Sequence, residues 1–255
     1  MFHRLRNFAS LSGYLTRRLA VDPLLTPARA SSFRSKLQVM RSAELRETMI
    51  PVRSLTDLGL QPGRVVVELL PFTDGNPSPV ELFCLGALVR ACGARAIFEI
   101  GTFDGTTTLQ LALNSPDDAV VWTLDLPAGA MDQTHFPVLP EDKPYIDKPT
   151  TGARFTKTPA AGKIHQLFGD SATFSYEPYL GRMDFVFIDG SHSLAYVRSD
   201  SARAFSLVRP GGWIVWHDYS VWPDVTTGLQ ELASQLPLVN LAGTTLVVGG
   251  LPAPE

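Results

Sequence analysis

The hydrophobic positions from residue 96 onward fall into short continuous runs that are separated by amphipathic stretches. Runs rich in Val, Ile and Phe predict buried strands at Ala96–Ile100, Val120–Asp125, Ile164–Phe168, Phe185–Asp189 and Trp213–His217. The stretches between them predict helices at Thr106–Asn114, Ala172–Leu180, Ser193–Val208 and Val225–Leu236. Strands that are apolar on both faces and alternate with helices are typical of a parallel sheet covered on both sides. We therefore predict an α/β, doubly wound fold.

Both ends of this pattern differ from the middle. Two apolar runs near the C-terminus, Leu238–Ala242 and Thr244–Val248, are separated only by Gly243, which predicts an antiparallel hairpin. Upstream, another short apolar run at Val65–Leu70 predicts one further strand. The sheet should therefore be mostly parallel, with a hairpin at its C-terminal end.

The chain divides into an extension, 1–77, and a domain, 78–255. The domain's first helix is predicted to begin at a capping box formed by Ser78 and Glu81, and to end at Gly93. One connection in the domain, 127–163, is long and rich in Pro, Gly, Lys and Asp. Long connections inside compact domains are often binding loops or lids, so we predict a lid-like insertion there.

Charge separates the extension from the domain. The first 53 residues hold ten Lys and Arg against three Asp and Glu, although the whole chain of 255 residues has a net charge of only −3. We expect a helical, amphipathic extension that packs on the acidic domain; contact with a membrane surface, organelle targeting and docking on a partner subunit stay open. A homodimer is plausible on the same ground. Because the domain that bears the site is acidic, nucleic acid is not the expected partner.

Cysteine usage and hydropathy bear on the cellular compartment. Cys84 and Cys92 fall in one predicted helix, about 12 Å apart, which a disulfide cannot bridge. We predict buried free thiols in a reducing compartment. No apolar run approaches the roughly 18 residues that would predict a transmembrane segment. The expected location is cytoplasmic.

A glycine turn follows the first predicted strand of the domain. Gly101 and Gly105 allow close approach of a ligand at a helix N-terminus. The dinucleotide fingerprint fails, because Phe103 and Thr106 stand at its second and third glycine positions. Glu99 would repel a pyrophosphate but suits a cation, and S-adenosylmethionine carries both an ammonium and a sulfonium. A nucleotide-dependent oxidoreductase is thus the weaker hypothesis.

Acidic residues end the next two strands. Asp125 is placed to bind both ribose hydroxyls, and Asp170, followed by Ser171, suits the adenine amino group. The C-terminal ends of parallel strands meet at one edge of a sheet, so these groups should face one crevice. The predicted cofactor-binding residues are Glu99, Gly101, Thr102, Phe103, Gly105, Thr106, Asp125, Asp170, Ser171 and Asp189.

Two later strand ends carry groups suited to catalysis. We predict catalytic roles for Asp189, His192 and Asp218, with His192 as a general base. Asp189, His217 and Asp218 form a candidate metal site, in which carboxylates suit Mg²⁺ and the imidazole favours Mn²⁺. A bound cation would lower the pKa of an acceptor hydroxyl. The simpler alternatives are that His217 is a buried hydrogen-bonding residue and that His192 caps the following helix.

Several motifs occur in order between Ser78 and Val248: the turn from Glu99 to Gly105, Asp125, Gly169-Asp170, Ile188-Asp189-Gly190-Ser191-His192, and Arg209-Pro210-Gly211-Gly212 followed by His217-Asp218. Together they resemble the class I S-adenosylmethionine-dependent methyltransferases. More narrowly, they resemble the bacterial predicted methyltransferases related to sugar O-methyltransferases of macrolide and aminocoumarin biosynthesis. This resemblance implies a Rossmann-like sheet of seven strands whose last strand is antiparallel.

Catechol O-methyltransferase-like enzymes are a more distant comparison. Asp189 matches their first metal ligand, His217-Asp218 takes the place of their Asp-Asn pair, and His192 stands where they have a catalytic Lys. His217 departs from the pattern as a softer ligand, so the resemblance leaves metal dependence open.

The leading hypothesis is methylation of a hydroxyl on a small molecule, a sugar or a glycosylated metabolite, with S-adenosylmethionine as donor and Mg²⁺ or Mn²⁺ as an optional cation. The alternatives are a metal-independent N- or carboxyl-methyltransferase with His192 as base, and a non-catalytic relative that only binds the cofactor.

Overall fold

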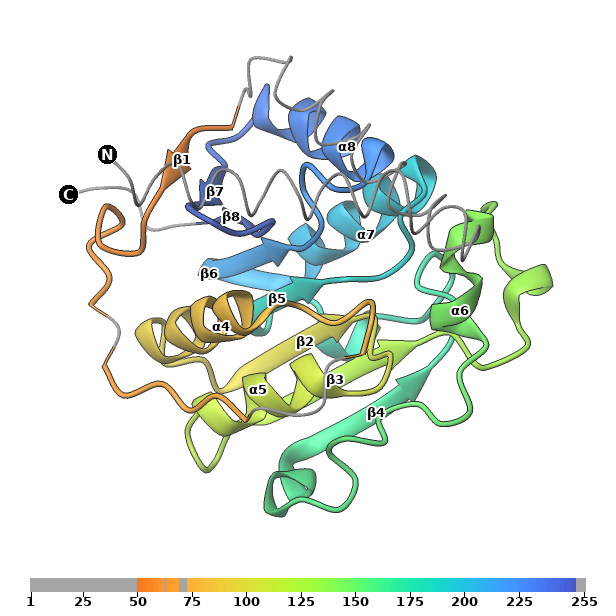
Figure 1. The fold of residues 1–255 in the computed structure, drawn as a ribbon, viewed down its shortest axis with the longest axis horizontal. Coiled ribbons are helices and arrows are strands. Elements are labelled where there is room, and N and C mark those ends of the chain that lie inside the picture. Colours follow the sequence, from red (N-terminus) through yellow and green to blue (C-terminus); the bar gives the residue numbers. More distant parts are fainter. Residues whose placement is uncertain (1–49, 62, 69–72, 251–255) are drawn as a thin grey trace, which may run out of the picture.

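A central sheet of eight strands organises the protein. The computed structural model describes residues 50–61, 63–68 and 73–250, and the strand order is β1-β7-β8-β6-β5-β2-β3-β4 (Figure 1). The strands are β1 (Val52–Arg53), β2 (Ala96–Ile100), β3 (Val120–Asp125), β4 (Ile164–Phe168), β5 (Met183–Ile188), β6 (Val208–Trp216), β7 (Val239–Leu241) and β8 (Val247–Gly249).

Helices cover both faces of this sheet, as predicted. The helices are α4 (Pro79–Ala91), α5 (Thr106–Asn114), α6 (Lys143–Ile146), α7 (Leu194–Leu207) and α8 (Pro223–Ala233). One core lies under α4 and α5, where Leu88 and Leu109 pack on the sheet. The other lies under α7 and α8, where Leu207 and Leu229 are fully buried (Figure 1). The two cores follow from strands that are apolar on both sides.

The predicted strand direction is confirmed. All neighbouring strands pair in parallel except β8, which is antiparallel to both β6 and β7. The doubly wound sheet with a C-terminal hairpin is therefore as expected. The sheet has eight strands instead of seven because β1 joins the edge of β7, where the Asn240 amide donates to the Pro51 carbonyl. A strand of two residues is too short to give a pattern in the sequence.

Local predictions at α4 are also confirmed. The Ser78 hydroxyl accepts from the Glu81 amide, and the Glu81 carboxylate accepts from the Ser78 amide at 2.7 Å, which completes the capping box. Gly93 follows the helix with a φ of 57°. Cys84 and Cys92 are free thiols, and burial raises the pKa of each to about 11.

The strand predicted at Val65–Leu70 is wrong over its described part. Residues 65–68 form no strand, and they run beside α5 instead. The Asn114 side chain accepts from the Val66 amide at 2.9 Å and donates to the Val66 carbonyl at 2.8 Å. A side chain thus satisfies the backbone groups that a neighbouring strand would have paired. The predicted helical extension at 1–49 lies outside the described residues.

The helix predicted at Ala172–Leu180 is also wrong. Only a single 3-10 turn, Glu177–Tyr179, forms there. Pro178 lacks the amide that a longer helix would need, and the Asp170 carboxylate accepts from the Ala172 amide at 2.9 Å, which favours a turn. Among the described helices, none is long and apolar enough to cross a membrane.

Replacing Gly101 tests how closely the segments that follow β2 and β5 must approach each other. A Cβ at this position would lie 2.0 Å from the Asp189 carbonyl oxygen, and φ is 101°. Gly129 has a similar φ of 77° but nothing within 4 Å. We expect Gly129→Ala to lower the free energy of unfolding by about 1–2 kcal/mol, the cost of a left-handed residue. Gly101→Ala should lower the free energy of unfolding by more than about 4 kcal/mol, or prevent folding, because the backbone at Gly101 and at Asp189 must also move apart. Urea denaturation would measure both, and equal losses would contradict the close-approach argument.

Candidate active site

The site lies where the backbone ladder of the sheet continues one residue beyond the strands. The Gly169 amide donates to the Asp125 carbonyl at 3.0 Å, and the Gly101 amide donates to the Leu124 carbonyl at 2.8 Å. In the same way the Asp189 amide donates to Ile100 at 2.8 Å, and the His217 amide donates to Ile188 at 3.0 Å. These bonds align the ends of β2, β3, β4, β5 and β6 side by side.

Two adjoining cavities open at these strand ends. The first is lined mainly by the ends of β2 to β5 and by the insertion, and its members include Phe103, Leu124, Asp125, Thr134, Val138, Asp170, Ser171 and Tyr196. The second lies toward α4 and β6 and includes Asp74, Asn76, Glu81, Thr102, His217, Asp218, Val221, Trp222 and Thr245. Both are lined by Gly101, Phe103, Tyr145, Asp189, Gly190 and His192. A ligand in one cavity would therefore meet a ligand in the other at these six residues.

The predicted glycine turn forms the shared wall. Phe103 has a φ of 49°, a left-handed conformation that is strained for an aromatic residue, and Gly105 caps α5 with a φ of 88°. The Phe103 amide donates to the Asp125 carboxylate at 3.0 Å. The turn is thus held against the end of the next strand.

Asp125 carries a buried ion pair that the sequence did not predict. The Lys148 ammonium, from the insertion, lies 2.8 Å from the Asp125 carboxylate, and both side chains are at least 90% buried. Burial raises the pKa of Asp125, although Lys148 acts against this. Asp125 lines the first cavity and Lys148 does not. The predicted ribose ligand is therefore present, with a cation from the insertion behind it.

Asp170 is in the predicted place and is extensively hydrogen-bonded. Its carboxylate accepts from the Tyr196 hydroxyl at 2.8 Å and from the His135 amide at 2.6 Å. Asp170 and Ser171 both line the first cavity. Asp170 therefore links the end of β4 to α7 and to the insertion.

Three of the predicted cofactor residues line neither cavity: Glu99, Gly105 and Thr106. Glu99 is fully buried beneath the turn, where its carboxyl group accepts from the hydroxyls of Thr108 and Thr123. Burial raises its pKa to about 8. Thr102 borders the second cavity, and its hydroxyl contacts Thr123 and Gln166.

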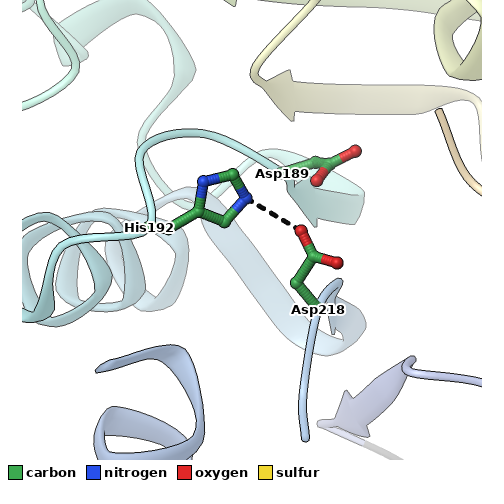
Figure 2. Close-up of side chains that lie close together, drawn as sticks. All are labelled: Asp189, His192 and Asp218. Carbon is green, nitrogen blue, oxygen red and sulfur yellow. Dashed lines mark hydrogen bonds and ion pairs between the residues drawn. The ribbon is translucent and has the colours of Figure 1, made fainter. Parts of the chain in front are cut away.

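The predicted catalytic residues come together at the junction of the cavities. Figure 2 shows His192 on the loop that begins at Asp189, with its imidazole directed toward Asp218 on the neighbouring loop. His192 Nε2 lies 2.8 Å from the Asp218 carboxylate, and Nδ1 lies 2.5 Å from the Asp142 carboxylate (Figure 2 for the first contact). The imidazole stacks on Trp222 with centroids 4.2 Å apart. Asp218 has a φ of 66°, a strained conformation of the kind that collects at functional sites.

His192 holds a proton in this arrangement. Burial lowers its pKa, but the hydrogen bonds to Asp142 and Asp218 outweigh that effect and raise it to about 10. The pKa of Asp218 is well below its ordinary range, because both histidines lie against it. The predicted role of His192 as a base therefore requires that Nε2 first lose the proton that it shares with Asp218.

The residues whose ligand atoms converge are Asp189, His192 and Asp218. One ligand atom from each lies within 4.8 Å of the others, and no other such group of three occurs among the described residues. His217, predicted as a metal ligand, contacts two members of this group. Its Nδ1 is 3.0 Å from Asp189 and 3.5 Å from Asp218, and its Nε2 is 3.6 Å from Glu81. His192 therefore joins the cluster beside His217.

Several residues of the site had no motif to identify them. Tyr145, Asp142 and Lys148 come from the insertion, whose loop composition gives no side-chain direction. The sequence identified Glu81 only as a helix-capping residue. Its other oxygen accepts from the Thr245 amide and hydroxyl, each at 2.8 Å, which ties α4 to the turn before β8.

The first cavity is small for a nucleotide-sized ligand. Its volume is about 90 Å³, against about 330 Å³ for the second. Ligand pockets usually have roughly 300–1,000 Å³. The insertion supplies Thr134, Val138 and Tyr145 to its wall, so it lies closed over this part of the crevice in the structure.

Comparisons with known proteins agree with this geometry. Residues 98–219 match a family model described as a methyltransferase domain. The chain is 28% identical over 159 residues to tricin synthase 1 of Oryza sativa subsp. japonica, covering 62% of this chain and 56% of that protein. It is 27% identical over 140 residues to caffeoyl-CoA O-methyltransferase 2 of Zea mays, covering 54% and 47%. The chain thus spans about half the length of these curated relatives.

A solved structure shares the fold. The O-methyltransferase TomG of Streptomyces achromogenes, solved in complex with S-adenosylmethionine, aligns with a TM-score of 0.50 and 19% identity, covering 70% of this chain and 83% of that one. The strand order and this alignment show that the chain shares the Rossmann-like fold of that structure. The match over residues 98–219, a little under half of the chain, is to a methyltransferase domain, so a methyltransferase is the class of protein that this chain resembles.

The buried Glu99 predicts a pH dependence of stability. Folded Glu99 keeps its proton up to about pH 8, whereas the unfolded residue loses it near its ordinary value of 4.5. Between these values the folded state binds more protons, so stability falls as pH rises. We expect Glu99→Gln to gain in melting temperature relative to wild type between pH 5 and pH 8. The exposed Glu141→Gln is the control, and parallel curves for Glu99→Gln and wild type would refute the prediction.

Proposed function

We propose that the protein transfers a methyl group from S-adenosylmethionine to a hydroxyl of a small molecule. The observation that carries this proposal is the junction of two cavities at Asp189, His192 and Asp218, within a methyltransferase domain. The cofactor belongs in the first cavity and the acceptor in the second. The named relatives that methylate oxygen support the choice of a hydroxyl, and a sugar or glycosylated metabolite is the acceptor class we infer from the sequence.

The residues of the first cavity fit S-adenosylmethionine. Asp125 presents a carboxylate for the ribose hydroxyls, and Asp170 and Ser171 lie where the adenine would bind. The turn at Gly101 and Phe103 borders both cavities, so it suits the methionine portion, which must reach the acceptor. Bound cofactor supplies an electrophilic methyl group on its sulfonium. The insertion must open for the cofactor to enter, because the cavity is smaller than such a ligand.

The chain's own residues orient the acceptor and handle its proton. Trp222, Tyr145 and Phe103 give the second cavity apolar walls, whereas Asp189, His192 and Asp218 provide hydrogen-bonding groups at its inner end. The acceptor oxygen loses its proton as the O–C bond forms and the S–C bond breaks. The His192–Asp218 pair is the group nearest to receive that proton, once His192 has released its own Nε2 proton to solvent.

The cluster also fits a divalent cation. Two carboxylates and one imidazole form a donor set that suits Mn²⁺ and, with added waters, Mg²⁺. In the structure a proton joins His192 to Asp218, so a cation would take the place of that proton. Bound there, it would lower the pKa of an acceptor hydroxyl.

The metal-independent alternative is supported by the same hydrogen bond. Once the His192–Asp218 pair has released the proton that it holds, it can accept one from the acceptor without any cation, and this holds for a nitrogen or carboxyl acceptor as well. Divalent-cation binding therefore decides between the two forms of the proposal.

Cofactor binding is the first prediction. Calorimetry with S-adenosylhomocysteine should show binding by wild type that weakens at least tenfold, about 1.4 kcal/mol, in Asp125→Asn, because the ribose loses its carboxylate. The exposed Asp117→Asn should bind as wild type does. Asp125→Asn leaves Lys148 buried without a counter-charge, so the double variant Asp125→Asn/Lys148→Met is measured beside it. A folded wild type that binds none of this ligand would overturn the proposed function.

Cation binding is the second prediction for this site. Electron paramagnetic resonance should detect Mn²⁺ bound to wild type, with affinity reduced at least tenfold in Asp218→Asn because one of two carboxylate ligands is lost. The exposed Asp132→Asn is the control. Equal affinity in all three proteins would exclude the metal role and leave the metal-independent form. The acceptor is then sought by S-adenosylhomocysteine formation across phenol and sugar hydroxyls.

A further inference from the structure

The insertion is docked on the site at three separate places. Its Gly152 amide donates to the Phe103 carbonyl at 3.0 Å, which fixes it to the glycine turn. Its Lys148 ammonium meets Asp125 at 2.8 Å, beside the proposed ribose position. Its Asp142 carboxylate meets the loop from Ser191 to His192. The insertion therefore contacts both the cofactor side and the acceptor side of the crevice.

Asp142 makes three contacts on that loop. Its carboxylate accepts from the Ser191 hydroxyl at 2.8 Å and from the His192 amide at 3.2 Å. Its other oxygen lies 2.5 Å from His192 Nδ1. Asp142 is only 3% exposed, although it comes from a connecting segment. A carboxylate this buried needs such partners, and all three belong to the two residues beside the transfer site.

The contact to Nδ1 fixes which nitrogen of His192 faces the acceptor. A carboxylate accepts but cannot donate, so Nδ1 carries a hydrogen toward Asp142 and Nε2 carries one toward Asp218 and the second cavity. Stacking on Trp222 at 4.2 Å restricts the remaining rotation of the ring. The imidazole is thus held in one orientation by a residue of the insertion, and Nε2 is the nitrogen that can exchange its proton with an acceptor.

We propose that Asp142 is a positioning residue for His192, so that closure of the insertion over the cofactor completes the methyl-transfer site. The proposal rests on the proposed function. It makes the orientation of His192 conditional on the insertion, because the segment that must move to admit the cofactor also carries Asp142. An enzyme built this way assembles its proton acceptor only after the cofactor is enclosed.

A purely structural role for Asp142 gives different expectations. In that case the contacts to the Ser191 hydroxyl and the His192 amide tie down the insertion, and the contact to the ring is incidental. The loss of stability in Asp142→Asn would then be the same whether or not residue 192 has an imidazole. The state of the His192 ring would also be independent of Asp142.

The test combines nitrogen NMR with a double-mutant cycle. Protein labelled with ¹⁵N-histidine is saturated with S-adenosylhomocysteine, and His192→Gln assigns the His192 resonances. We expect wild type to show a downfield Nδ1 proton that disappears in Asp142→Asn. In urea denaturation, Asp142→Asn should lower the free energy of unfolding clearly less in the His192→Gln background than in wild type. In that background the contact between Asp142 and the imidazole is already absent.

The matched control is Asp147→Asn. Asp147 lies at the end of α6 in the same insertion, but its side chain is 40% exposed and pairs only loosely with Lys143, at 3.9 Å. This variant should keep the wild-type histidine spectrum.

Two outcomes would overturn the proposal: a His192 spectrum unchanged in Asp142→Asn, or an equal loss of stability in both backgrounds. If Asp142→Asn does not fold, the wild-type spectrum alone still tests the proposal. A His192 ring that carries a proton on Nε2 but none on Nδ1 would contradict it. A wild type that binds no S-adenosylhomocysteine instead refutes the proposed function, while the NMR and the cycle still report on Asp142.

Discussion

The continued backbone ladder at the strand ends is the constraint on which the rest of the site depends. Four amide-to-carbonyl bonds beyond the strands hold Gly101, Gly169, Asp189 and His217 in register. Each of these residues begins the loop that carries site groups. Because the strands are parallel, their C-terminal loops meet at one edge, and the ladder sets the spacing between loops. Gly101 is where this spacing is tightest, since its neighbour across the sheet is the carbonyl of Asp189.

Charge is concentrated at that edge and is compensated locally. Asp125, Asp142 and Asp218 are largely buried, and each lies within 3 Å of a cationic group, either Lys148 or His192. An unpaired carboxylate at such depth would cost several kcal/mol, roughly, so these partners are required for folding as well as for function. Ligands that bring a positive charge, such as a sulfonium or a divalent cation, enter a site whose acidic residues are already organised to receive one.

The fold was predictable where the pattern depends on burial over many residues. Most strands from β2 to β6 are rich in apolar residues, so each run was visible and its end placed Asp125, Asp170 and Asp189 at the cavity. The predictions at 65–68 and 172–180 failed because single side chains, Asn114 and Asp170, take over backbone hydrogen bonds that propensity assigns to a strand or a helix. Such tertiary contacts leave no periodicity in the sequence.

The positions of the candidate site residues were predictable from the sequence, but their contacts were not. Strand-end motifs located Asp189, His192 and Asp218, but they could not show that His192 and His217 both contact Asp218, since the rotamers of both histidines depend on distant partners. Glu81 holds His217 from α4, and Asp142 holds His192 from the insertion. In a loop without a repeating pattern, the sequence does not predict which way the side chain of an aspartate points.

The sheet and the insertion contribute different kinds of residues to the site, for a physical reason. Asp125, the proposed ribose ligand, and Asp189 and His192, proposed to lie at the methyl group, follow the ends of rigid strands that the ladder holds in register. Lys148 and Asp142 contact Asp125 and His192 from a segment that also lines the first cavity. A cavity of about 90 Å³ is too small for S-adenosylmethionine, so the proposed function requires this segment to separate from the ladder when the cofactor binds. The ionic contacts of the insertion can therefore break and re-form. Each is made to a carboxylate or an imidazole that the ladder keeps in place while the insertion is separated from the strand ends.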